Sequence, residues 1–169
     1  MVLSDRATIV LDTAVLLNFI RIDRMDLLQP LAVPLLVPED VRQEVTRPDQ
    51  RKVLEAAISS GLLHVESIAD RVEVALFADL ARIGRFGPGE RAVMAVALTR
   101  GMAAGLQERL AGAEMRRRDK AARIVTTEDI VLRTIKAGGI TVPDADGLLV
   151  EWRTHHRFAS RMKTFEGMA

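Results

Sequence analysis

Four acidic residues, Asp12, Glu44, Glu90 and Asp129, are widely separated along the chain. Asp12 ends an apolar run, Glu44 lies within Val37–Val45, and Glu90 opens an apolar helical pattern. Asp12 and Asp129 directly follow runs that have the composition of β-strands. In a parallel α/β sheet, ligands and catalytic groups collect at the carboxyl ends of the strands. Carboxylates gathered there repel one another unless a cation neutralises them, and oxygen ligands suit Mg²⁺ or Mn²⁺. We therefore expect the four acids to hold a divalent metal ion at a catalytic centre.

The segments that must position these acids alternate between strand-like and helix-like patterns. Short runs with β-branched residues predict strands at residues 7–11, 35–37, 62–65, 123–127 and 140–142. Helical spacing of apolar residues predicts helices at residues 14–20, 38–46, 50–60, 69–83, 91–99 and 130–137, followed by a C-terminal helical segment at 144–169. This alternation predicts an α/β fold with a parallel sheet of about four to five strands, flanked by helices, in a single domain spanning residues 1–169.

Composition narrows the class of protein further. A length of 169 residues fits one domain with a sizeable core, and 49% hydrophobic and 28% charged residues are typical of a globular protein. The net charge of +1 neither requires nor excludes nucleic acid, so any binding surface must be a local patch. The absence of cysteine excludes disulfides and zinc thiolate sites. The first residues lack a secretory signal pattern, and the apolar run Leu27–Pro38 is too short to span a bilayer, so we expect a cytoplasmic protein without membrane contact.

Four segments in order resemble the acidic segments of the PIN-domain family. They are Ile9-Val10-Leu11-Asp12-Thr13, Val37-Pro38 with Val41 and Glu44, Gly89-Glu90-Arg91-Ala92, and Ile124-Val125-Thr126-Thr127-Glu128-Asp129. The resemblance covers residues 7–143. It implies a PIN-like fold and a Mg²⁺- or Mn²⁺-dependent endoribonuclease in which Asp12, Glu44, Glu90 and Asp129 hold the metal. Because many small members of the family are VapC-like toxins, it also implies RNA as substrate and an antitoxin protein as partner.

One departure from the compact family pattern is the long interval between the third and fourth acids. The extra segment, residues 102–122, has apolar residues along one helical face and ends in the basic run Arg116–Lys120. We interpret it as a helical insertion before the strand that carries the fourth acid. The basic run, together with Arg123, is a candidate contact for phosphate, although charge runs are more often solvated faces.

Each acid also has a purely structural interpretation. Asp12 and Asp129 could cap the helices that follow them, and Glu90 could be favoured at a helix start by the helix dipole. Glu44 could be a solvated helical acid. Two alternatives therefore stand beside a ribonuclease: a PIN-like RNA-processing or nucleotide-binding module with weak or no catalysis, and a non-catalytic protein-interaction domain. The three histidines, His64, His155 and His156, are expected at the surface or in packing rather than at a metal.

The C-terminal segment carries an apolar stripe of Trp152, Phe158, Met162 and Phe165 among basic residues. The stripe could belong to an amphipathic helix that packs on its own domain or on a second subunit. In a chain whose core is already well supplied, a lone domain would leave much of it exposed, and exposed apolar patches usually mark partner surfaces. We therefore expect at least a homodimer, or an antitoxin bound to this segment.

Overall fold

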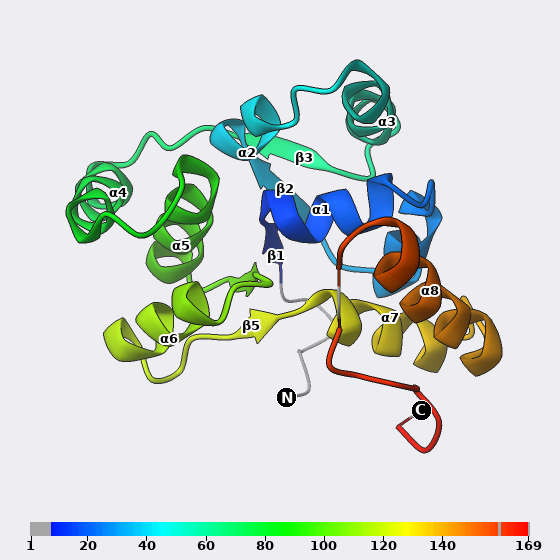
Figure 1. Ribbon diagram of the computed structural model, residues 1–169. Helices are drawn as coiled ribbons and strands as arrows, with labels where there is room; N and C mark the ends of the chain where they lie inside the picture. Colours follow the sequence, from blue (N-terminus) through cyan, green and yellow to red (C-terminus); the bar gives the residue numbers. More distant parts are fainter. Residues whose placement is uncertain (1–7, 159, 169) are drawn as a thin grey trace.

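A five-stranded parallel sheet forms the centre of the computed structural model, which describes residues 8–158 and 160–168 (Figure 1). The strand order is β3-β2-β1-β4-β5. The strands are β1 (Ile9–Leu11), β2 (Leu35–Pro38), β3 (His64–Glu66), β4 (Ala103–Gly105) and β5 (Ile124–Val125). The α/β fold with a parallel sheet flanked by helices, expected from the alternating pattern, is confirmed.

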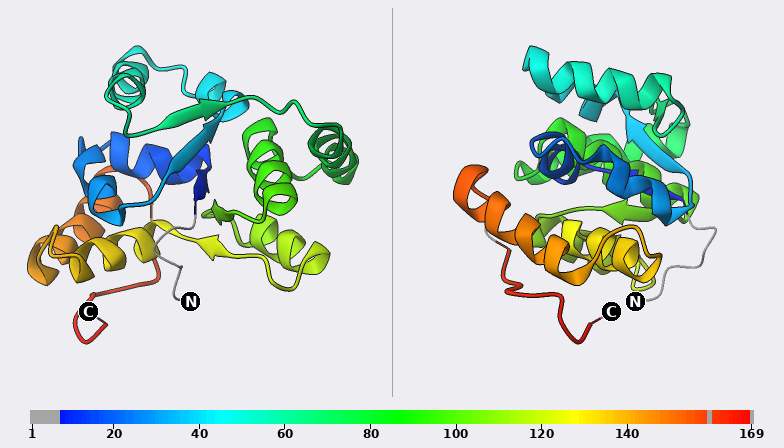
Figure 2. Two further views of the ribbon diagram at one scale, coloured as in Figure 1. Left: turned by 180° about the vertical axis from the view of Figure 1, so that it is seen from behind. Right: turned by 90° about the vertical axis from the view of Figure 1, so that its right-hand side faces the viewer.

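Helices cover both faces of this sheet. Figures 1 and 2 show α4, α5 and α6 on one side and α1, α7 and α8 on the other. The helices are α1 (Thr13–Ile20), the 3-10 helix η1 (Met25–Leu31), α2 (Glu39–Glu44), α3 (Pro48–Ser59), α4 (Arg71–Ile83), α5 (Pro88–Arg100), α6 (Arg109–Arg118), α7 (Thr127–Lys136) and α8 (Val142–His155). In the described part of the chain, none of these helices has the length and apolarity needed to cross a membrane.

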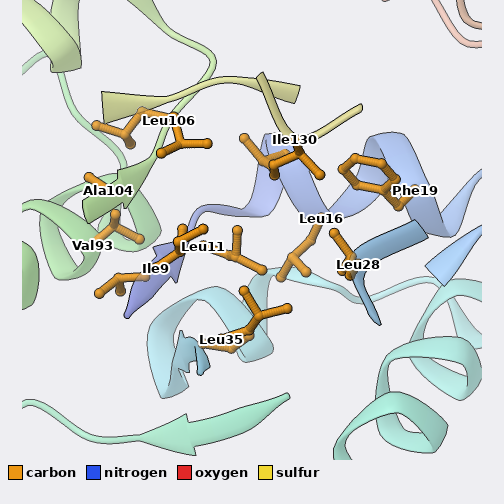
Figure 3. Close-up of a cluster of buried hydrophobic side chains, with 14 of the residues drawn as sticks. Ile9, Leu11, Leu16, Phe19, Leu28, Leu35, Val93, Ala104, Leu106 and Ile130 are labelled. Carbon is orange, nitrogen blue, oxygen red and sulfur yellow. The ribbon is translucent and has the colours of Figure 1, made fainter. Parts of the chain in front are cut away.

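The core lies on either side of β1, whose three residues are fully buried (Figure 3). Because successive side chains of a strand point to opposite faces, β1 contributes to both helix layers. On one side, helix α5 is buried at every position from Ala92 to Ala97. A helix that is apolar on all sides must be enclosed, and α5 accordingly packs between α4 and the strands. The site residues that follow β1 and begin α5 are therefore attached to buried elements of the core.

The predicted helical insertion at residues 102–122 is wrong in its first part. Residues Ala103–Gly105 form β4, which pairs with β1 on one side and β5 on the other. Only Arg109–Arg118 is helical, as α6. Alanine and glycine have low strand propensity, so the segment gave no strand signal. The structure nevertheless requires small residues here, because a Cβ on Gly105 would lie 2.8 Å from the Leu11 Cδ2 atom.

The predicted strand at residues 140–142 is also wrong. Thr141 is instead the N-cap of α8, where its hydroxyl oxygen accepts a hydrogen bond from the Asp144 N–H at 3.3 Å. Pro143 lies in the first turn of the helix, where its missing N–H costs nothing. The capping threonine and the proline outweigh the β-branched pair in this segment. Helix α8 then ends at His155, so the predicted C-terminal helical segment is helical only in its first half.

The C-terminal apolar stripe packs within its own domain, which corrects the expectation that it is exposed. The side chains of Trp152 and Phe165 are fully buried. The Trp152 Nε1–H donates to the Asn18 carbonyl at 2.7 Å, and its ring makes edge contacts with Phe19 and Phe158. The exposed stripe was the reason to expect a homodimer, and that reason no longer holds.

Candidate active site at the carboxyl ends of the central strands

The carboxyl ends of β1 and β4 meet at the point where the strand order of the sheet reverses. From β1 the chain proceeds outward to β2 and β3, and later returns to β4 and β5 on the other side. The Asp12 N–H donates to the Gly105 carbonyl at 3.0 Å, which fixes the two strand ends side by side. Open α/β sheets bind their ligands at such a switch point. A cavity of about 580 Å³ lies there. It is lined by Asp12, Thr13, Ala14, Leu17, Asn18, Arg21, Glu44, Arg85, Phe86, Gly87, Glu90, Gln107, Glu108, Leu110, His156, Arg157 and Phe158.

Asp12 is the most buried acid of the cavity. It follows β1 directly and caps α1, where its Oδ1 accepts a hydrogen bond from the Thr13 N–H at 2.7 Å. Only 2% of its surface is exposed. Burial, followed by the negative charges of Glu90 and Glu44, raises the pKa of the Asp12 carboxyl to about 7 against the lowering effect of the Thr13 N–H. Near neutral pH this carboxyl is therefore only partly ionised, because the protein itself does not compensate its negative charge.

Glu44 is the last residue of α2, and two groups hold its carboxylate toward the cavity. Its Oε1 accepts a hydrogen bond from the Gly89 N–H at 2.8 Å, and its Oε2 accepts one from the Thr13 hydroxyl. The carboxylate lies directly against Gly89, since a Cβ at that position would meet the Glu44 Oε2 at 2.5 Å. Glycine is therefore required at this position if Glu44 is to keep its place.

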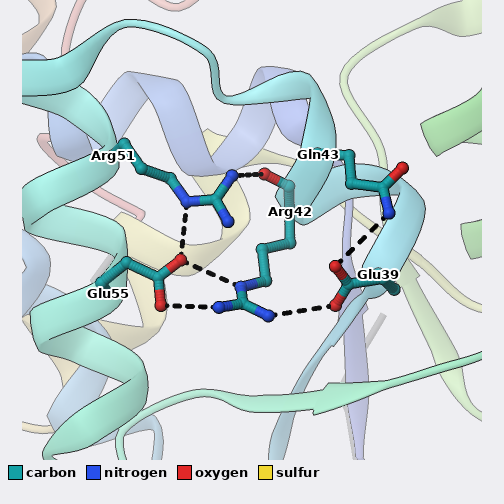
Figure 4. A network of polar contacts seen from close by, with 5 residues as sticks. All are labelled: Glu39, Arg42, Gln43, Arg51 and Glu55. Carbon is teal, nitrogen blue, oxygen red and sulfur yellow. Dashed lines mark hydrogen bonds and ion pairs between the residues drawn. The ribbon is translucent and has the colours of Figure 1, made fainter.

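A polar network behind Glu44 fixes helix α2 on α3 (Figure 4). The Arg42 guanidinium makes two parallel hydrogen bonds of 2.9 Å to the two Glu55 oxygens, a geometry in which arginine binds carboxylate well. Arg51 donates to the same Glu55 carboxylate at 2.6 Å and to the Arg42 carbonyl at 2.8 Å. Because α2 has only six residues, these contacts supply the rigidity that its own hydrogen bonds lack.

Glu90 lies in the first turn of α5 and lines the cavity. Its Oε2 accepts a hydrogen bond from the Gly87 N–H at 3.0 Å, so it serves the start of its own helix. Burial raises the pKa of Glu90, and the charges of Glu108 and Glu44 raise it too, whereas the Gly87 N–H lowers it. A helix cap alone would have no such repulsive neighbours. Glu90 therefore combines a local capping role with membership of a carboxylate cluster.

A further acid, Glu108, was missed by sequence reasoning. It immediately precedes α6 and lines the cavity, as does its neighbour Gln107. Both follow β4, the strand whose small residues gave no strand signal in the sequence. The available signal was the buried run at residues 103–106, because the two residues that follow it both have side-chain oxygens. Recognising that run as a strand would have placed Gln107 and Glu108 at the switch point beside Asp12.

The structure brings together three of the four predicted acids, Asp12, Glu44 and Glu90, and places Asp129 outside the cavity lining. Asp129 follows the edge strand β5 and is exposed. Its Oδ2 accepts a hydrogen bond from the Thr126 N–H at 2.9 Å, and the Thr126 hydroxyl accepts one from the Asp129 N–H at 3.2 Å. This reciprocal pair is the capping box of α7, the structural interpretation considered for this acid.

The residues at the cavity fit a hard divalent cation in their chemistry. The donors are carboxylates and the Gln107 amide, all of which offer oxygen. Burial, and after it the neighbouring carboxylates, raises the pKa values of Asp12 and Glu90, and a bound cation would stabilise the charged forms. In residues 8–158 and 160–168, however, no group of three or more His, Cys, Asp or Glu side chains is arranged to hold a metal ion as it stands. Ligand binding would therefore have to draw the acids closer together.

Basic residues line the same cavity without pairing with its acids. Within the described residues, Arg21, Arg85 and Arg157 make no side-chain hydrogen bond or ion pair. The basic run Arg116–Lys120, a candidate phosphate contact, lies outside the cavity lining and is partly paired, because Arg117 and Arg118 share Glu114 at 2.7 Å and Arg118 also pairs with Asp79 at 2.7 Å. Positive charge that is available to a bound anion lies at the cavity itself.

Comparison with known proteins agrees with this geometry. No curated protein matches the chain. A family model described as a PIN domain matches residues 8–161, which is nearly the whole chain and includes every residue that lines the cavity. The chain therefore belongs to the PIN-domain family, as its four acidic segments suggested.

Proposed function

We propose that the protein is a Mg²⁺- or Mn²⁺-dependent endoribonuclease that hydrolyses phosphodiester bonds at the cavity around Asp12. PIN domains are generally nucleases and typically use divalent metal ions. The observation that carries the proposal is the buried Asp12 carboxylate, whose pKa is raised to about 7 beside two further acids at the switch point of the sheet. Perturbed carboxylates in a cleft are candidates for function, because keeping them there destabilises the fold.

Asp12, Glu44 and Glu90 are the residues that would hold the metal, with Glu108 beside them. A divalent ion bound there would supply Lewis acidity and a lowered pKa for a water nucleophile. The chain itself contributes position and charge. Thr13 and Gly89 orient the Glu44 carboxylate, and the helix starts at Asp12 and Glu90 fix the other two acids. Arg21, Arg85 and Arg157 line the cavity and have no side-chain partner among the described residues. They would draw the phosphate into the cavity and offset the charge that develops on it.

The toxin of a toxin–antitoxin pair is the biological role that we propose for such a ribonuclease. It rests on the likeness of the four acidic segments to the PIN-domain family, many of whose small members are VapC-like toxins, and on the family match. A neighbouring short reading frame that encodes a DNA-binding start and an amphipathic end would support it. Co-expression of the two products should then give a stable complex without ribonuclease activity, whereas the absence of such a neighbour would count against the role.

A second candidate function is RNA or nucleotide binding with weak or no catalysis. The observation that favours it is the absence, in the described part of the chain, of a ready-made group of three metal-ligating side chains. A non-catalytic interaction domain is a further alternative, since Asp12, Glu90 and Asp129 each cap a helix. Repulsion among the acids of one cavity is the feature that neither alternative requires.

The deciding experiment is an RNA cleavage assay with Mg²⁺, Mn²⁺ and EDTA. Wild-type protein should cleave with either metal and not with EDTA, and Asp12→Asn should be inactive. Asp129→Asn is the matched control, because it makes the same chemical change at a helix cap outside the cavity, and it should retain activity. Cleavage that survives Asp12→Asn, or a wild type that cleaves nothing with either metal, would reject the proposed activity.

A further inference from the structure

A second cavity, of about 620 Å³, adjoins the first and shares part of its wall. Both cavities are lined by Arg21, His156 and Arg157, so the second cavity borders the one that holds the acids. The second cavity lies among the end of α1, the start of α3 and the end of α8, which Figure 1 shows next to one another. Arg47 and His155 also contribute to it. The acids Asp12, Glu44, Glu90 and Glu108 line only the first cavity.

Basic side chains outnumber acidic ones in the lining of the second cavity. Its lining contains three arginines and two histidines against two acids, Asp23 and Asp49. Arg47 pairs with Asp49 at 2.9 Å, which neutralises one of the arginines. Arg21 and Arg157 have no side-chain partner in the part of the chain that the structure describes. These two arginines are therefore available to an anion, and both line the two cavities.

Contacts with Trp152 hold the segment that carries Arg157 in place. The N–H groups of His156 and Phe158 both donate to the Trp152 carbonyl, at 3.1 and 3.2 Å, and the Trp152 ring is itself anchored to the Asn18 carbonyl. Arg157, between them, has a φ of 55°, a left-handed conformation that is unusual for a residue other than glycine. The fold thus turns the chain sharply at the arginine that borders both cavities.

We propose that the second cavity is a phosphate subsite, which holds the backbone of a single-stranded RNA next to the phosphodiester bound at the acids. The inference rests on the proposed nuclease function and extends it to the substrate. Arg21 and Arg157 would contact the phosphates beside the scissile one. A single strand is required because the scissile phosphate must reach a carboxylate that is only 2% exposed, inside a recess. An unpaired backbone can bend into such a recess, whereas a duplex is stiff and is recognised across its grooves.

The test is binding, measured without catalysis. Fluorescence anisotropy of a labelled single-stranded oligoribonucleotide in EDTA, over a range of salt concentrations, gives the affinity and its salt dependence. Arg21→Gln and Arg157→Gly should each weaken binding by about fivefold to tenfold, and each should lower the slope of log K against log salt by about 0.7. Glycine is chosen at position 157 because it removes the charge and suits the left-handed backbone.

Arg82→Gln is the matched control, because Arg82 is an exposed arginine on α4 that lines neither cavity. It should bind like the wild type. Three outcomes would overturn the subsite: unchanged affinity and slope in both arginine variants, an equal loss in the Arg82 variant, or no binding by the wild type. A duplex RNA that binds as tightly as the single strand would overturn the restriction to single strands.

A deoxyribonucleotide strand of the same sequence distinguishes RNA from the shared phosphodiester chemistry. Tighter binding of RNA, lost in the same variants, supports the proposal, whereas tighter binding of DNA would overturn RNA as the substrate. Binding and cleavage together distinguish failure of the subsite from failure of the proposed nuclease activity. Arginine-dependent binding without cleavage in any metal would reject the nuclease and keep the subsite. Metal-dependent cleavage with arginine-independent binding would reject the subsite and keep the nuclease.

Discussion

Replacing Asp12 with asparagine should stabilise the metal-free protein, and the gain should grow with pH. The Asp12 carboxyl has a pKa of about 7 in the folded protein against an ordinary value of 3.8. Between these two pH values the folded state holds a proton that the unfolded state has released, so stability falls as pH rises and then stays level above pH 7. Asparagine keeps the oxygen that caps α1 but carries no charge.

The magnitude follows from the same two pKa values. At 1.36 kcal/mol for each pKa unit, a buried Asp12 costs about 4 kcal/mol at pH 8 and about 1–2 kcal/mol at pH 5. Because the loss accumulates over the two pH units between pH 5 and pH 7, the advantage of Asp12→Asn should increase by about 3 kcal/mol between pH 5 and pH 8. For a chain of 169 residues this corresponds to an increase of about 5–10 °C in the melting-temperature difference.

Urea unfolding in EDTA at both pH values measures the effect, with Asp129→Asn as the control at an exposed helix cap. Millimolar Mn²⁺ at pH 8 should then raise the melting temperature of the wild type more than that of Asp12→Asn, because ligand binding stabilises only the protein that binds it. An Asp12→Asn advantage that is absent, or that is equal at pH 5 and pH 8, would refute the argument that burial strains this carboxylate.

Four further predictions concern the residues that support the site and the C-terminal segment. Gly89→Ala should displace the Glu44 carboxylate and lower metal affinity and cleavage by about 10–100-fold, with little change in the melting temperature. Glu55→Gln should loosen α2, which hydrogen exchange of the α2 amides would detect, together with a fall in activity. Trp152→Ala should cost about 3–5 kcal/mol in urea unfolding. Truncation after Leu149 should accordingly abolish folding, as seen by circular dichroism. If the truncated chain instead stays folded but forms a different oligomer, as measured by light scattering, the C-terminal segment would again be a candidate interface.

The sequence predicted the fold well where the side chains carried a periodic signal. β1, β2 and β5 consist of aliphatic residues and lie where the pattern put them. β4 was missed because its residues are two alanines and a glycine. Their small size follows from close packing against β1 and α5, which is a tertiary requirement with no local pattern.

The misplacement of Asp129 has the same origin as the missed strand. Without β4, the segment ending at Val125 would lie beside β1, and the acid after it would face Asp12. With β4 between them, β5 is the edge strand, and the position beside Asp12 passes to Gln107 and Glu108. Sequence alone could group Asp12, Glu44 and Glu90, which line one cavity, because each lies in or beside an element that was recognised correctly. Strand order, which decided the fourth position, depends on long-range pairing that no short motif encodes.

Capping and metal binding are compatible roles for the acids of this cavity. Helices α1, α5 and α6 all begin at its wall, so the positive ends of three helix dipoles point toward the carboxylates. Each dipole stabilises an acid by only about 0.3–1 kcal/mol at a surface, which is less than the roughly 4 kcal/mol that burial of Asp12 costs at pH 8. The caps therefore make the cluster tolerable without neutralising it. The remaining imbalance is what a divalent cation would offset, and the same helix starts would favour the phosphate of a bound strand.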